Sequence, residues 1–138
     1  MALSNIAVFP QTPKTAGISF ASSSQSTEMD PATVSPTTLL TAGADGALVT
    51  SIRYFGEVTV TPQKVVLWVQ PGGAGNWYIV DEQLQAAYTM ATTSAQTPVT
   101  FVDKNVEADA IRLAASDKIG ITHHVDLQGI AYVEYTDY

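Results

Sequence analysis

Short runs of apolar and β-branched residues recur along the chain and are separated by clusters of turn-forming residues. The clearest example lies between residues 39 and 52, where the pair Asp45-Gly46 interrupts two apolar runs. An Asp-Gly pair supplies the positive φ that a hairpin turn requires. We therefore predict a strand, a tight turn and a second strand, with Leu48 and Ile52 on one face of the second strand.

Apolar residues alternate most regularly from Val58 to Gln70, where we predict a strand. Val65, Leu67 and Val69 share one face of a predicted strand, and Val66 and Trp68 share the other. Apolar residues on both faces indicate a strand at the centre of a sheet, or a strand whose outer face is covered.

Other short strands follow at regular spacing, at residues 18–22, 77–80, 98–102, 109–115, 118–125 and 129–135. The Gly-rich segment 71–76 is predicted to be a hairpin-type loop, because it lacks the Lys-Ser/Thr of a phosphate-binding loop. Residues 81–91 favour a strand or loop over a helix. About eight short strands predict an all-β fold, and the Ser/Thr/Pro-rich link 22–38 suits a crossing between two sheets. We therefore predict a jelly-roll-like β-sandwich.

The N-terminal residues 1–14 are predicted to form an extended arm, and residues 15–138 the β-sandwich domain. Proline residues in the arm remove backbone donors and favour extended conformations. Ile6, Val8 and Phe9 give the arm apolar side chains. The arm has two possible conformations. It could be a strand packed on its own domain, or it could reach over a neighbouring subunit and add to a sheet edge.

Composition and charge narrow the classes of partner. The 138 residues fit one domain, and 14% charged residues is low for a globular protein. The net charge is −7, and the six basic residues are scattered, so neither nucleic acid nor an anionic membrane surface is an expected partner. The N-terminus lacks the features of a signal peptide, and no run approaches the ~18 apolar residues of a membrane span. We expect a protein made in the cytoplasm.

The adjacent residues His123 and His124 are the first candidates for metal binding or catalysis. Neighbouring side chains on a strand point to opposite faces, so the two rings cannot easily share one metal ion. We predict one half-buried, hydrogen-bonded His and one surface His; a metal-binding or pH-sensing role at a subunit interface is the alternative.

Other catalytic or metal-binding patterns are weak. The carboxylates that could suggest calcium lack the Asp-x-Asp-x-Asp-Gly loop, so we predict a solvated rim at Asp81, Glu82, Asp103, Glu107 and Asp109. No Gly-x-Ser-x-Gly nucleophile elbow is present. We therefore expect neither enzymatic activity nor a cofactor.

Aromatic residues are candidates for carbohydrate stacking or for packing and subunit contact. Stacking on a sugar is possible for Trp68, Trp77, Tyr78 and Tyr88, although packing in the core or an interface is the commoner outcome. The predicted contact residues with other subunits are Ile6, Val8, Phe9, Trp68, Trp77, Tyr135 and Tyr138.

Several segments in a fixed order carry a resemblance to small β-sandwich proteins encoded among the structural genes of tailed bacteriophages. These segments are Thr12-Pro13-Lys14, Ile18-Ser19, Leu40-x-Ala42-Gly43-Ala44-x-Gly46, Ser51-Ile52-Arg53, Val66-Leu67-Trp68-Val69 before a Gly-containing loop and Trp77, Ile119-Gly120-Ile121-Thr122, and Tyr135-Thr136-Asp137-Tyr138. The ending departs from the Gly-Gly-Asp-Tyr-like ending of many relatives.

This resemblance implies a capsid decoration (cement) protein, which bridges capsid subunits on the outside of the assembled head and catalyses no reaction. It implies the major capsid protein as partner, self-association as a homotrimer, and location on the outer capsid surface of the virion. The acidic chain agrees with the outer face, because packaged DNA is also negatively charged. The alternatives are a tail-, neck- or fibre-associated virion protein, which could bind a host glycan through its aromatic residues, and a small hydrolase.

Overall fold

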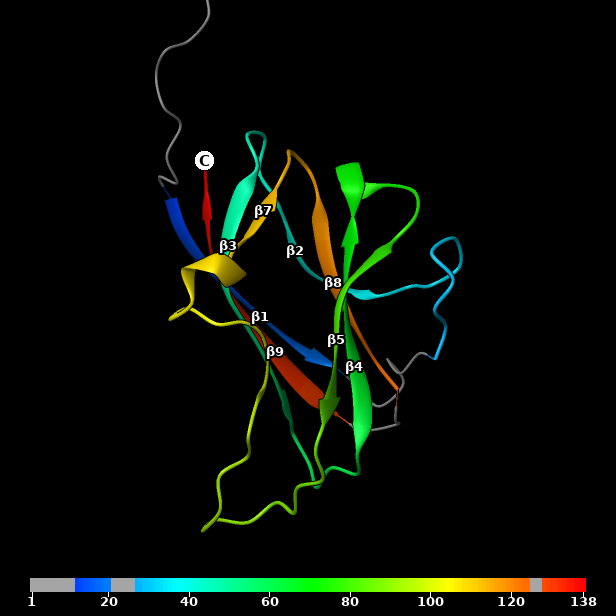
Figure 1. Ribbon diagram of the computed structural model, residues 1–138, viewed down its shortest axis with the longest axis vertical. Coiled ribbons are helices and arrows are strands. Elements are labelled where there is room, and N and C mark those ends of the chain that lie inside the picture. Colours follow the sequence, from blue (N-terminus) through cyan, green and yellow to red (C-terminus); the bar gives the residue numbers. More distant parts are fainter. Residues whose placement is uncertain (1–11, 21–26, 125–127) are drawn as a thin grey trace, which may run out of the picture.

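Two antiparallel sheets face each other in the computed structural model, which describes residues 12–20, 27–124 and 128–138 (Figure 1). Two short 3₁₀ helices, η2 (Pro71–Gly73) and η3 (Glu107–Asp109), interrupt the strands. The strands of the described residues are β1 (Thr12–Phe20), β2 (Thr37–Thr41), β3 (Ala47–Gly56), β4 (Gln63–Gln70), β5 (Tyr78–Gln85), β6 (Val99–Val102), β7 (Ile111–Leu113), β8 (Lys118–His123) and β9 (Gly129–Asp137).

The strand order is that of a jelly roll. One sheet has the order β1-β9-β3-β6, with the three-residue β7 also paired to β3, and the other has the order β2-β8-β4-β5. Successive strands alternate between the sheets except from β4 to β5 and from β6 to β7, and apart from β7 each sheet contains four strands. The predicted jelly-roll-like sandwich is confirmed, with β7 as a ninth strand. The link between β1 and β2 joins different sheets, as its composition suggested.

The core lies between the sheets and is formed by side chains from every strand except β5. Val49, Ile52, Leu67, Ile119 and Val133 are among its fully buried members. Burial of such apolar side chains stabilises the domain by about 25 cal/mol for each Å² removed from water.

A bulge in β3 corrects one prediction about its faces. The register between β3 and β9 shifts between Val49 and Ser51, so the buried positions change from odd to even numbers along the strand. Leu48 is therefore partly exposed, whereas Ile52 is fully buried. The expectation that the two residues share one face is wrong, because one extra residue reverses every later side chain.

The predicted hairpin around Asp45-Gly46 is also corrected. β2 pairs with β8 and β3 pairs with β9, so the turn carries the chain from one sheet to the other. The turn itself forms where predicted: Gly46 has φ 90° and its amide donates to the Gly43 carbonyl at 3.2 Å. A Cβ at Gly46 would overlap the Leu113 carbonyl, so a side chain is excluded there by both conformation and space.

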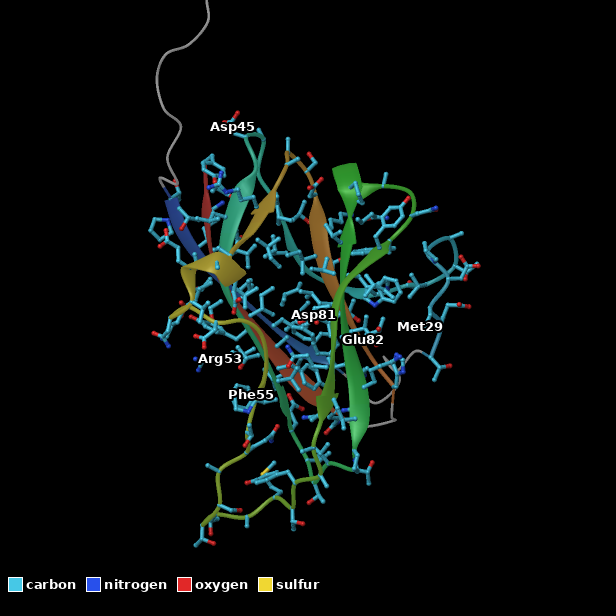
Figure 2. The ribbon with its side chains drawn as sticks, viewed as in Figure 1. Met29, Asp45, Arg53, Phe55, Asp81 and Glu82 are labelled. Atoms are coloured by element: carbon cyan, nitrogen blue, oxygen red, sulfur yellow. The ribbon has the colours of Figure 1, made fainter. Side chains whose placement is uncertain are left out.

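β4 is a central strand and its outer face is covered, which confirms both consequences of its two apolar faces. It lies between β8 and β5. Val66 and Trp68 pack on its outer face with Val34 and Trp77, against which Met29 also lies (Figure 2).

Several strand limits differ from the prediction. β1 begins at Thr12, so residues 12–14 belong to the sandwich; the remainder of the predicted arm lies outside the described residues. β4 begins at Gln63, and the earlier Val60 forms only an isolated bridge to Tyr88. β5 extends to Gln85, and residues 86–91 form no helix, in agreement with the predicted strand or loop. Across the described parts of the chain, no helix has the length and apolar character needed to cross a bilayer.

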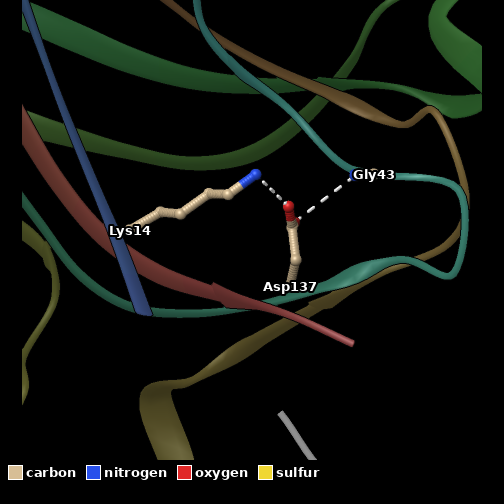
Figure 3. A network of polar contacts seen from close by, with 3 residues as sticks. All are labelled: Lys14, Gly43 and Asp137. Atoms are coloured by element: carbon tan, nitrogen blue, oxygen red, sulfur yellow. Dashed lines mark hydrogen bonds and ion pairs between the residues drawn. The ribbon is translucent and has the colours of Figure 1, made fainter. Parts of the chain in front are cut away.

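The first and last strands are joined at one end of the sandwich by a polar contact (Figure 3). Lys14 Nζ lies 2.6 Å from Asp137 Oδ2, and the Gly43 amide donates to Asp137 Oδ1 at 3.4 Å. The hydrogen bond and the negative charge of Asp137 raise the pKa of Lys14. One carboxylate therefore connects β1, β9 and the link between β2 and β3.

Candidate binding surface

The largest group of exposed apolar side chains lies on β5. We call Tyr78, Ile79, Val80 and Leu84 the β5 surface; these are four of the eight large apolar residues that are exposed in the described chain. Leu84 is 73% exposed and Tyr78 is 49% exposed. Exposed apolar side chains that gather on one element mark interaction sites more often than scattered ones do.

The position of β5 in the sheet explains this exposure. β5 is the last strand of its sheet and pairs only with β4. The pairing shifts between Leu67 and Trp68, opposite the bulged residue Val80. The edge position and the bulge leave three consecutive apolar residues, Tyr78 to Val80, in contact with solvent.

Two carboxylates stand between the apolar residues of the β5 surface. Asp81 and Glu82 are adjacent at the middle of β5 (Figure 2). Asp81 Oδ1 accepts the Glu82 amide at 2.8 Å, and Asp81 Oδ2 accepts Gln83 Nε2 at 3.1 Å. Lys64 Nζ lies 3.3 Å from Glu82 Oε2 in an exposed ion pair, and a hollow of about 200 Å³ runs between Lys64 and Leu84. Lys64 thus pairs with Glu82, while Asp81 bonds to Gln83 on the other face of the strand.

A second, smaller apolar group lies on the outer face of the five-stranded sheet. Ile130 and Tyr132 of β9 are 43% and 40% exposed, and Tyr132 Oη donates to Glu134 Oε1 at 3.1 Å. In the register of the sheet they neighbour Phe55 and Arg53 of β3, which are labelled in Figure 2. Arg53 Nε is buried and has no hydrogen-bond partner among the described residues.

His123 is the last residue of β8, and His124 follows the end of the strand. His123 is fully buried in the core rather than half-buried, and its Nδ1 lies 3.2 Å from the Tyr54 hydroxyl. Burial raises the pKa of Tyr54 to about 12. His124 is partly exposed. Its pKa is lowered mainly by desolvation and to a lesser extent by the nearby positive charge of Lys64. His123 is fully buried because the core of the sandwich extends to this end of β8.

In the predicted carboxylate rim, Asp103 and Asp109 accept hydrogen bonds from backbone amides of their own loop. Asp103 Oδ1 accepts the Asn105 amide at 2.9 Å, and Asp109 Oδ2 lies 3.4 Å from the Asp103 amide. Within residues 12–20, 27–124 and 128–138, no three His, Asp or Glu side chains gather as metal ligands would.

The aromatic residues divide between the core and the surface. Trp68 is fully buried and Trp77 is 8% exposed, so both are core residues, and their assignment as contacts with another subunit is corrected. The Trp68 indole donates to Thr122 Oγ1 at 2.9 Å, and Tyr88 Oη donates to the Ser94 carbonyl at 2.7 Å. Only Tyr78 of the four sugar-stacking candidates is an exposed residue.

The other predicted contact residues are divided in the same way. Tyr135 and Tyr138 are partly exposed near the end of β9, and Tyr135 also packs against the core. Ile6, Val8 and Phe9 lie outside the described residues. Sequence reasoning missed Ile79, Val80 and Leu84, because an apolar run predicts a strand but does not tell an edge strand from a central one.

Comparison with known proteins adds little to these observations. No protein-family model and no curated protein matches the chain. Among solved structures, that of Eiger TNF from S. frugiperda is similar over 94% of this chain and 96% of that chain, with 14% identity and a TM-score of 0.42. A likeness at this level carries no argument, so the jelly roll is assigned here from the order of the strands.

Proposed function

We propose that this chain is a structural protein of a tailed bacteriophage that binds the outside of the assembled capsid and bridges capsid subunits without catalysing a reaction. The β5 surface carries this proposal, because a protein that binds another protein through a rigid domain needs an exposed apolar contact area. The sequence resemblance supports the phage assignment, and the jelly-roll strand order agrees with the fold that the resemblance implies.

Two further properties support a decoration role. A homotrimer on a lattice engages several capsid subunits together, so modest contacts of each copy give strong binding, because the later contacts are intramolecular. The net charge of −7 favours the outer capsid surface over contact with packaged DNA. The proposed partners are the major capsid protein and other copies of this chain, and neither nucleic acid nor a membrane.

The number of copies in purified particles tests the proposal. Quantitative mass spectrometry against the major capsid protein should give a ratio near one to one, or a fixed fraction of that order. A handful of copies would place the protein in the neck, tail or fibre, and absence from particles would overturn the proposal.

Binding to bare capsids tests the surface itself. We expect Ile79→Ser to weaken co-sedimentation of the purified protein with capsids. Val106→Ser is the matched control, because Val106 is 44% exposed and Ile79 is 45% exposed, but Val106 lies outside the β5 surface. Equal binding by both variants would exclude the β5 surface. Deletion of residues 1–11 tests the arm separately and leaves β1 intact.

A further inference from the structure

The β5 surface has a shape and charge that select one kind of partner. We propose that it binds an extended, positively charged segment of a different protein, and not a second copy of this chain. The inference rests on the proposed function only in taking that different protein to be a capsid subunit.

The occupant is extended because β5 is a sheet edge. β4 covers one side of β5 through the pairs Gln63↔Gln85 to Val69↔Tyr78, and no strand of the described chain pairs with the other side. The main chain of an edge strand can accept a further strand, while pockets and charges beside it select the side chains of that strand.

A second copy is disfavoured by the position of the carboxylates. Asp81 and Glu82 occupy the middle of the eight-residue strand. Symmetric antiparallel pairing of two β5 strands centred on these residues would place Asp81 opposite Asp81 of the other copy, or Glu82 opposite Glu82. Like charges directly opposite each other destabilise strand pairing, and here they would meet at the two-fold axis. The Glu82 amide is also already bonded to Asp81.

The same carboxylates favour a basic partner. Lys64 pairs with Glu82, while the contacts of Asp81 are with an amide N–H and a glutamine side chain, so negative charge remains in excess. Tyr78, Ile79 and Val80 precede this charge and Leu84 follows it. A complementary segment therefore has lysine or arginine at its centre and apolar residues on both sides.

Peptide binding to the full chain tests the inference. The probe is a fluorescent nine-residue peptide with lysines at its centre and valines at both ends, and the comparison peptide has glutamate in place of lysine. We expect the lysine peptide alone to bind, and Asp81→Asn with Glu82→Gln to weaken it about tenfold. Asp45→Asn with Glu107→Gln is the control, since it removes the same charge from exposed sites outside β5; Asp45 is labelled in Figure 2.

Each outcome decides between the alternatives. Equal loss of peptide binding in both double variants would reveal non-specific attraction to an acidic protein and overturn the inference. A change in the mass of the protein in analytical ultracentrifugation caused by Ile79→Ser would assign the β5 surface to a second copy and also overturn it. Failure of the proposed function is seen separately, as absence of the protein from particles, whatever the peptide does.

Discussion

The close approach of Gly129 and Tyr54 gives the sharpest prediction about stability. Gly129 begins β9, and a Cβ built on it would overlap the Oη and Cζ atoms of Tyr54 and lie 2.8 Å from Cε2. Tyr54 is fully buried, lies 5.8 Å from the Phe20 ring and contacts His123 through its hydroxyl. In Gly129→Ala the tyrosine ring must therefore move within a closely packed core.

Overpacking of this kind costs about 1–3 kcal/mol, and loss of the Tyr54–His123 hydrogen bond adds roughly 1 kcal/mol. We expect Gly129→Ala to lower the free energy of unfolding by about 2–4 kcal/mol and Tm by roughly 10 °C. Urea unfolding followed by tryptophan fluorescence measures the first quantity, and calorimetry measures the second.

Gly17→Ala is the matched control for this substitution. Gly17 lies in the neighbouring strand β1, and the nearest atom to its added Cβ is the Ala131 carbonyl oxygen at an ordinary 3.8 Å. Tyr54→Leu should remove most of the additional cost of Gly129→Ala, because the ring that clashes is gone. The reasoning fails if Gly129→Ala is as stable as Gly17→Ala, or if its cost is unchanged in the Tyr54→Leu background.

Polar groups give three further predictions. The pKa of Tyr54 is about 12 in the folded protein and about 10 in the unfolded chain, so the contribution of Tyr54 to the free energy of unfolding is fully present below pH 10 and falls by roughly 3 kcal/mol as the pH rises through 12. Urea unfolding at a series of pH values should show a smaller fall for Tyr54→Phe than for the wild type. An equal fall would contradict the assignment to Tyr54. Thr122→Val leaves the Trp68 indole N–H without its acceptor and should cost about 1–3 kcal/mol in urea unfolding, more than Thr122→Ser, which keeps the hydroxyl. Asp137→Asn removes the ion pair with Lys14, so Tm should depend less on added salt than in the wild type, and an unchanged dependence would show that the pair contributes nothing.

The alternation of apolar residues was sufficient to predict the fold class. Two apolar faces on residues 65–69 correctly indicated a central, covered strand, because one face packs in the core between the sheets and the other packs against Val34 and Trp77. Regular spacing of short strands and a long polar link were sufficient for a jelly roll. These features are properties of single strands and connections, which local sequence determines.

The failures concern which strands pair and which edges stay open. Asp45-Gly46 forms a turn, but whether a turn joins partners in one sheet depends on residues far away, such as those of β8 and β9. The bulge beside Thr50 has no sequence signal and reverses one face of β3. The same limit applies to the site: Trp68 and Leu84 are equally apolar in the sequence, and only the order of strands buries one and exposes the other.

The last two strands of the chain are the inner strands of the two sheets: β8 lies between β2 and β4, and β9 lies between β1 and β3. The ribosome delivers N-terminal segments first, so β1 emerges long before β9, its only partner in the sheet. Pairs such as Thr12↔Asp137 join residues from nearly opposite ends of the chain, and contacts of this kind make folding slow. The sandwich therefore assembles only after β9 has been synthesised, and a product that stops before residue 118 would leave both sheets with open apolar edges, which favour aggregation.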